Sequence, residues 1–195
     1  MKLKIFTLSF LCSSLLLSAK AITDSSNPDQ NPKTLSYSSV LLFPELSGKA
    51  TGIGAKFCTS NLLNVNPKFS IGPSVFLERL VFPKYLEEKN IKNTRTTLLS
   101  PGLNGKYHLN PNCDLQLDLT LLIGFETRER IVPSASGRTV EDPKPLSGLQ
   151  LEQTFFYRVS QKKGVQLGIG VFERITDSNI YHSDFGIKTY VGFGW

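Results

Sequence analysis

The chain has 195 residues, which suits one domain, and its 22 basic and 16 acidic residues give a formal net charge of +6. The first 21 residues hold three of the lysines and no acid, so the rest of the chain carries a net charge of only +3. So modest an excess, without a run of Lys or Arg, gives no reason to expect a nucleic-acid partner.

The first 21 residues have the pattern of an export signal. Two lysines precede an apolar run at 5–17, and Ala19 and Ala21 fit the small-x-small pattern of a cleavage site. The run is shorter than the ~20 apolar residues that span a membrane as a helix, so cleavage after Ala21 is favoured over a retained anchor. We expect the polar, proline-containing segment 22–33 that follows to be disordered.

From residue 34 onward, apolar and polar residues alternate in segments separated by turn-forming clusters, which predicts strands. The eight segments are 34–43, 49–58, 68–82, 95–109, 114–126, 148–159, 165–174 and 184–195. The alternation is clearest in 114–126, where Leu122 is the one exception. Most of the segments reach the ~9–11 residues that a tilted strand needs to cross the hydrocarbon core of a membrane.

The last segment, 184–195, has one strongly apolar face, and no helix is predicted that could cover it. Lipid would cover the face in a closed barrel, the one arrangement of strands that satisfies its backbone in a membrane. We therefore expect 184–195 to close a barrel by pairing with both 165–174 and 34–43. Segment 34–43 alternates least regularly, with Leu41 and Phe43 assigned to its apolar, outward face. A soluble β-sandwich is the alternative.

The connectors between the segments favour the barrel. Counted from the N-terminus, the odd connectors are 44–48, 83–94, 128–147 and 175–183. The even connectors are 59–67, 110–113 and 160–164. Most odd connectors are longer and richer in charge, and two of the even ones are tight turns, although the first of each kind departs from the rule. Long outer loops and short periplasmic turns are typical of outer-membrane barrels.

The whole mature chain, 22–195, resembles the small eight-stranded outer-membrane β-barrels of Gram-negative bacteria, of the OmpA, OmpX and opacity-protein type. The features that carry the resemblance are the A-K-A signal, the eight alternating segments and the terminal Y-V-G-F-G-W. It implies an all-β, eight-stranded antiparallel up-and-down transmembrane β-barrel over 34–195, located in the outer membrane, with outer-membrane lipid and lipopolysaccharide as partners. It also implies that Tyr190, Phe193 and Trp195 belong to a signal read by the barrel assembly machinery, although phenylalanine is the usual last residue.

If the apolar faces meet lipid, the other faces fill the interior of a barrel just wide enough for side chains. Ten titratable side chains then point inward: Lys56, Glu78, Lys106, His108, Asp118, Glu126, Glu152, Arg158, Arg174 and Lys188. Unpaired buried ions are strongly unfavourable, and the signs nearly balance, so we expect a plugging salt-bridge network rather than an open channel. Inward glycines such as Gly168 and Gly186 either leave room for long charged side chains or relieve curvature.

Few residues suggest chemistry. The adjacent pair His182 and Ser183 differs from the two-residue spacing of barrel lipid A deacylases and would point to opposite faces of a strand, so we expect no enzyme. No Cys or His cluster has metal-ligand spacing, and no cofactor is expected. Cys58 and Cys113 fall at the same rim of the barrel but two strands apart, so a disulfide between them would require a bent turn and is left open.

Three functions follow from this interpretation. The first is a structural, adhesive or envelope-stabilising barrel that acts through its outer loops. Its longest connector, 128–147, is then the first candidate for contact with a host, a phage or lipopolysaccharide, because rigid scaffolds carry function on surface loops. The alternatives are a narrow pore for small solutes and a lipid A-modifying enzyme.

Overall fold

The computed structural model describes residues 38–59, 63–66, 68–82, 91–131, 138–159, 164–178 and 182–194. The export signal at 1–21, the segment 22–33 and Trp195 lie outside the described residues. Within the described residues, no helix is long and apolar enough to cross a membrane.

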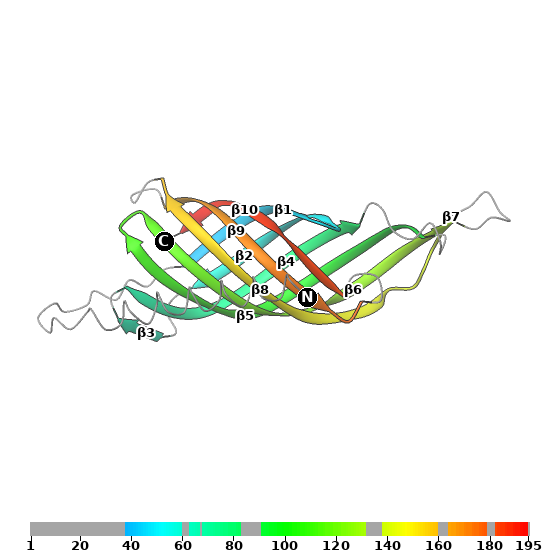
Figure 1. Cartoon of the computed structure of the whole chain (residues 1–195), viewed down its shortest axis with the longest axis horizontal. Coiled ribbons are helices and arrows are strands. Elements are labelled where there is room, and N and C mark those ends of the chain that lie inside the picture. Colours follow the sequence, from blue (N-terminus) through cyan, green and yellow to red (C-terminus); the bar gives the residue numbers. More distant parts are fainter. Residues whose placement is uncertain are drawn as a thin grey trace, which may run out of the picture.

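Eight antiparallel strands form a closed ring (Figure 1). In ring order they are β1 (Ser38–Ser47), β2 (Thr51–Thr59), β4 (Phe69–Phe82), β5 (Ile91–Asn110), β6 (Cys113–Ile131), β8 (Lys144–Arg158), β9 (Val165–Thr176) and β10 (Ser183–Gly194). The ring closes where β10 pairs with β1, from Ser39 opposite Gly194 to Ser47 opposite Gly186. The predicted all-β barrel and its closing strand are therefore confirmed.

The ring has two unlike ends. At the loop end, the chain reverses between β1 and β2, β4 and β5, β6 and β8, and β9 and β10. At the turn end, it reverses between β2 and β4, β5 and β6, and β8 and β9, and the described part of the chain begins and ends there. A short strand, β3 (Leu63–Asn66), pairs with β4 at the turn end, and β7 (Arg138–Val140) pairs with β6 beyond the loop end.

The connectors are more ordered than the sequence predicts. The segment 128–147 was assigned to one loop, yet β6 continues to Ile131 and β7 then pairs with its last residues, Glu129 opposite Val140. Connector 59–67 likewise contains β3. The reason is that both additions are short, four residues in β3 and three in β7, so even the alternation of Leu63 and Val65 with asparagines in β3 is too brief to predict a strand. Both are held by main-chain pairing with a longer neighbouring strand.

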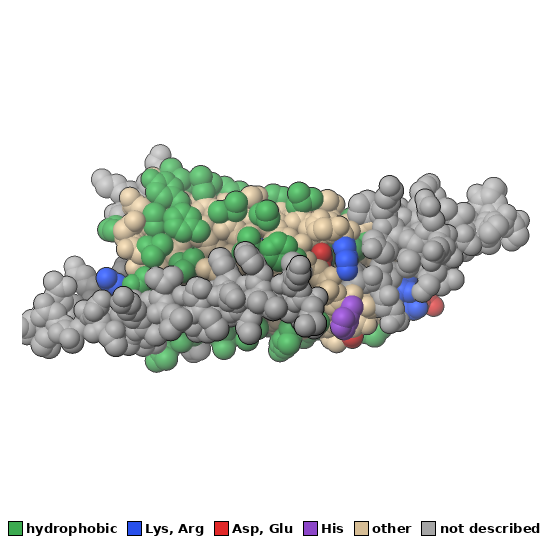
Figure 2. Space-filling model, viewed as in Figure 1, with side chains coloured by type: hydrophobic (Ala, Val, Ile, Leu, Met, Phe, Trp, Pro, Cys, Tyr) green, Lys and Arg blue, Asp and Glu red, His purple; other side chains and the backbone are tan. Residues whose placement is uncertain are grey.

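Alternation places apolar side chains outside the ring. Figure 2 shows apolar side chains spread over the visible wall of the barrel. On the outer wall as a whole, Leu42, Ile53 and Phe125 each have at least 60% of their surface exposed. Charged side chains interrupt this apolar outer wall at a few positions, where Arg79 and Arg95 are exposed and Glu173 is half-buried. An apolar outer wall is the face that lipid covers in a membrane barrel.

Strand β1 corrects one sequence assignment. Leu41 and Phe43 point into the barrel, with 1% and 2% of their surface exposed, whereas Leu42 is 60% exposed. Their faces were assigned the wrong way round because the alternation of 34–43 is ambiguous. The inward choice is stabilised by aromatic contacts, since the Phe43 ring lies 5.1 Å from the ring of Tyr190 and 6.1 Å from that of Phe76.

The interior is layered. Near the loop end, a buried apolar layer joins side chains from the wall and the first loop: Ala50, Leu80, Phe82, Leu98, Leu122 and Leu146. Leu122, the exception to the alternation of its strand, thus belongs to the interior. The charged side chains described next lie below this layer, farther from the loop end. A second buried cluster lies among them and extends toward the turn end; it consists of Leu41, Phe43, Cys58, Phe76, Phe156 and Tyr190.

Candidate functional site in the barrel interior

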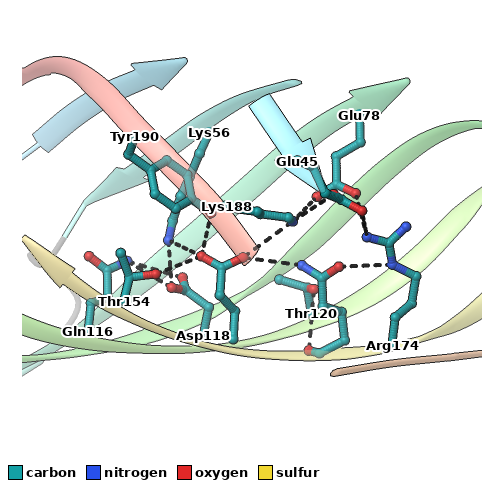
Figure 3. Close-up of polar contacts among 12 residues, drawn as sticks. Glu45, Lys56, Glu78, Gln116, Asp118, Thr120, Thr154, Arg174, Lys188 and Tyr190 are labelled. Atoms are coloured by element: carbon teal, nitrogen blue, oxygen red, sulfur yellow. Dashed lines mark hydrogen bonds and ion pairs between the residues drawn. The ribbon is translucent and has the colours of Figure 1, made fainter. Parts of the chain in front are cut away.

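Seven fully or almost fully buried charged side chains form a central network, and each comes from a different strand of the ring (Figure 3). Its members are Glu45, Lys56, Glu78, Asp118, Glu152, Arg174 and Lys188. Only β5 contributes none of them. The network therefore joins almost the whole circumference of the barrel across its interior.

Lys188 lies at the centre of the network. Its Nζ is 2.6 Å from Glu78 Oε1, 3.3 Å from Glu152 Oε2 and 3.6 Å from a carboxylate oxygen of Glu45. Arg174 donates to Glu45 through Nη2, and the same nitrogen lies 3.7 Å from Glu78. One ammonium group and one guanidinium group thus hold three carboxylates together.

Lys56 extends the network toward the turn end. Its Nζ donates to Asp118 at 2.6 Å and lies 3.5 Å from Glu152 Oε1. The same Glu152 oxygen accepts hydrogen bonds from the hydroxyls of Thr154, at 2.8 Å, and of Tyr190. These neutral donors satisfy lone pairs that the cations leave free, which lowers the cost of burying the carboxylate.

Aromatic rings enclose the two lysines. Lys188 Nζ lies 4.7 Å from the centroid of the Phe43 ring and 4.9 Å from that of Phe76, and Lys56 Nζ lies 4.7 Å from the Phe76 centroid. A ring face attracts a desolvated cation, by ~2 kcal/mol or more where water is excluded. Phe43 and Phe76 also fill space between the lysine stems, so the centre of the barrel is packed.

The inward glycines make room for rings. A Cβ added at Gly168 would lie 2.6 Å from the ring of Phe156, and one added at Gly186 would lie 2.7 Å from the ring of Phe172. At these two positions the space is used by an aromatic side chain rather than by a long charged one.

A second group of charges lies at the turn end. Asp114 accepts a hydrogen bond from Arg158 Nη2 at 2.6 Å and shares one with His108 Nδ1 at 2.5 Å. Lys106 is buried on the same strand as His108. Asp114 has the same inward parity as Asp118 and Glu126 in the segment 114–126, but it is not one of the ten predicted interior residues.

A third group lies at the loop end. Glu126 accepts hydrogen bonds from Arg128 Nε and from the hydroxyl of Ser178, each at 2.6 Å. The ten residues singled out in the sequence therefore divide among three depths. Six lie in the central network, three (Lys106, His108 and Arg158) at the turn end, and Glu126 at the loop end.

Glu45 is the member of the central network that sequence reasoning missed. The predicted first strand ended at residue 43, whereas β1 continues to Ser47. The signal was present, since Glu45 has the same parity as Ser39 on a strand whose other parity carries Leu42 and Leu46. The wrong choice of inward face hid it.

Comparison with known proteins finds the same architecture among solved structures, but no matching family model or curated sequence. No protein-family model matches the chain, and no curated protein shows significant sequence similarity to it. Among solved structures, the barrel superposes on Neisserial surface protein A (TM-score 0.55, 11% identity), covering 82% of this chain and 95% of that one. It also superposes on Ail, the attachment invasion locus protein of Yersinia pestis (TM-score 0.52, 9% identity), over 82% and 99% of the two chains.

The chain has the fold of the small eight-stranded outer-membrane β-barrels. At these identities the likeness concerns the fold alone. A second structure of Ail, in complex with the heparin analogue sucrose octasulfate, matches this barrel equally well, with a TM-score of 0.52.

The remaining sequence candidates have separate positions in this barrel. Cys58 and Cys113 are both free, so the disulfide left open by the sequence is not formed. Cys58 points inward, where its Sγ lies 2.9 Å from the hydroxyl of Ser39. His182 and Ser183 are both exposed at the loop end. Within the described residues, no group of His, Cys, Asp and Glu side chains could hold a metal ion.

The residues assigned to an assembly signal face different ways. Tyr190 is 3% exposed and belongs to the interior, where it donates to Glu152, whereas Phe193 is 60% exposed on the outer wall. Trp195 lies outside the described residues. Recognition of this strand by an assembly machinery stays a prediction.

Proposed function

We propose that this chain is an outer-membrane protein whose barrel is a closed, non-conducting anchor and whose biological contacts are made by the strands that project from the loop end. One observation carries the proposal: the interior is closed twice, by the central network and by the apolar layer around Leu122. An ion that crossed the barrel would have to displace both layers. A channel is therefore the less favoured function.

The projecting strands support the second half of the proposal. β5 and β6 have 20 and 19 residues, against 10 and 9 for β1 and β2. β8 pairs with β6 only as far as Glu126, and β6 continues for five more residues, at ~3.3 Å each. The last three of them, 129–131, pair with β7. In Figure 1, β7 lies beyond the end of the ring. A ribbon of paired strands above a membrane anchor suits adhesion or contact with other envelope components.

The direction of insertion gives the most direct test of this function. In a Cys113→Ser background, Val140→Cys places an exposed thiol on the ribbon, and Asn112→Cys places one in the β5–β6 turn. On intact cells, we expect a membrane-impermeant maleimide to label Val140→Cys and to label Asn112→Cys only after the outer membrane is permeabilised. Recovery of the protein in the soluble periplasmic fraction, or the opposite labelling pattern, would refute the proposal.

A further inference from the structure

An apolar groove of about 580 Å³ lies on the outer wall over β1, β2 and β4. Its lining includes Leu42, Ile53, Ala55, Leu77, Arg79 and Val191, and we call it the β2 groove. The register of the strands explains why the groove forms. Ala55 stands between Leu42 on β1 and Leu77 on β4, so a short side chain forms a floor between two long ones.

A cation stands at one end of the β2 groove. Arg79 is exposed on the outer wall, opposite Ile53 on one side and Thr97 on the other, three residues before β4 ends at Phe82. Arg95, on β5, is exposed on the same wall near the same end of β4, since it pairs with Val81. Within the described part of the chain, no carboxylate forms an ion pair with either arginine.

An arginine on a lipid-facing wall requires an anion or water for its guanidinium group. With the orientation proposed above, Arg79 lies in the half of the membrane that faces outward, where its long side chain can reach the headgroup level. The guanidinium group binds phosphate through two parallel hydrogen bonds. The apolar groove below it fits a hydrocarbon chain. The required occupant therefore combines a phosphate with acyl chains.

We propose that the β2 groove binds a phosphorylated, multiply acylated glycolipid of lipid A chemistry, with one acyl chain over Ala55 and a phosphate on Arg79 and Arg95. The inference rests on the proposed membrane orientation. A second copy of the chain is the less favoured occupant. A symmetric dimer that met at this groove would bring Arg79 of one copy against Arg79 of the other. A carboxylate that a second copy could offer to Arg79 is Glu173, which faces outward on β9, on the opposite side of the ring, and is half-buried in the wall.

The test measures lipid retained by the purified, folded full chain in detergent, with native mass spectrometry as the readout. The probes are bisphosphorylated lipid A, the same lipid without its phosphates, and phosphatidylethanolamine. We expect the wild type to retain bisphosphorylated lipid A. We expect Arg79→Gln to reduce the bound fraction at least fivefold, Arg79→Lys to reduce it less, and Ala55→Phe to reduce it by filling the groove.

Two matched controls isolate the groove. Leu119→Phe adds a ring at an exposed position of the outer wall on β6, and Lys144→Gln removes an exposed cation at the loop end of β8. Both should retain lipid A as the wild type does. If Ala55→Phe fails to fold, as judged by unchanged migration on a detergent gel with and without boiling, Ala55→Leu replaces it. Arg79→Gln alters only the outer surface and is informative in either case.

Three results would overturn the inference. The first is equal retention of lipid A by wild type, Arg79→Gln and Ala55→Phe. The second is retention of the dephosphorylated lipid A, or of phosphatidylethanolamine, equal to that of bisphosphorylated lipid A. The third is assembly into oligomers that is abolished by both Arg79→Gln and Glu173→Gln, which would make a second copy the occupant. In each case the protein would still be found in the outer membrane. Failure of the proposed function would instead appear as wild type absent from that membrane.

Discussion

Lys188 Nζ lies 2.6 Å from Glu78 Oε1 in the centre of the barrel, although 110 residues separate them in the chain. The two side chains come from β10 and β4, which do not pair with each other, so the contact spans the interior of the closed ring. The pair therefore connects the interior chemistry of this barrel directly to its topology.

Replacement of Lys188 by Met should destabilise the barrel strongly. It leaves Glu78, Glu45 and Glu152 without their shared cation, and loss of one partner from a buried ion pair costs about 3–5 kcal/mol. The double variant Lys188→Met/Glu78→Leu should recover part of this loss. Unfolding by urea in lipid vesicles, followed through the single tryptophan, measures both.

Lys144→Gln is the control, because Lys144 is exposed and lies 3.8 Å from Glu141. Its free energy of unfolding should stay within about 0.5 kcal/mol of the wild type. If Lys188→Met lowered the free energy of unfolding by less than about 1 kcal/mol, the role assigned to the central network would be contradicted.

Gly186→Ala tests the close packing of rings against the wall. The added Cβ would lie 2.5 Å from the carbonyl oxygen of Leu46 and 2.7 Å from the Phe172 ring. Overpacking of this kind costs about 1–3 kcal/mol, and we expect that loss in the same urea titration. Gly48→Ala is the matched control, because nothing lies within 4 Å of the position of its Cβ. Equal stability of the two variants would show that the interior is looser than described.

The sequence identified all eight strands of the ring because lipid outside and polar side chains inside impose a period of two. It also selected six members of the central network by parity. It could not assign their depths, because the residues of different strands that meet at one depth depend on the stagger between neighbouring strands. Parity alone therefore put Glu126 and Asp118 into one set, although they lie at different depths along β6 and contact different partners. Strand β7 escaped prediction because its pairing with β6 is made by the main chain rather than by apolar alternation.

Asp177 gives a pH-dependent prediction outside the membrane. Its carboxylate accepts hydrogen bonds from the Ser147 amide at 2.8 Å and from the Ser147 hydroxyl at 2.7 Å, and the bond from the amide holds the pKa of Asp177 below its ordinary value. A depressed folded-state pKa means that the stabilisation is fully present above the ordinary carboxyl pKa and is lost as pH falls through the folded-state value.

Hydrogen exchange of the Ser147 amide measures this effect locally. At neutral pH, the amide should exchange faster in Asp177→Asn, whose side chain accepts less strongly, than in the wild type. The difference should vanish once the pH lies below the folded-state pKa of Asp177. Identical exchange at neutral pH would show that Asp177 does not hold the β9–β10 connection to β8.

The closed interior is the central claim, and single-channel recording on the wild type in a planar lipid bilayer tests it most directly. A porin inserted under the same conditions serves as the positive control, and fast migration of the unboiled protein on a detergent gel establishes that the barrel is folded. We expect no steady conductance steps, because the central network and the apolar layer both block the path. Large, steady steps from the folded wild type would contradict the claim.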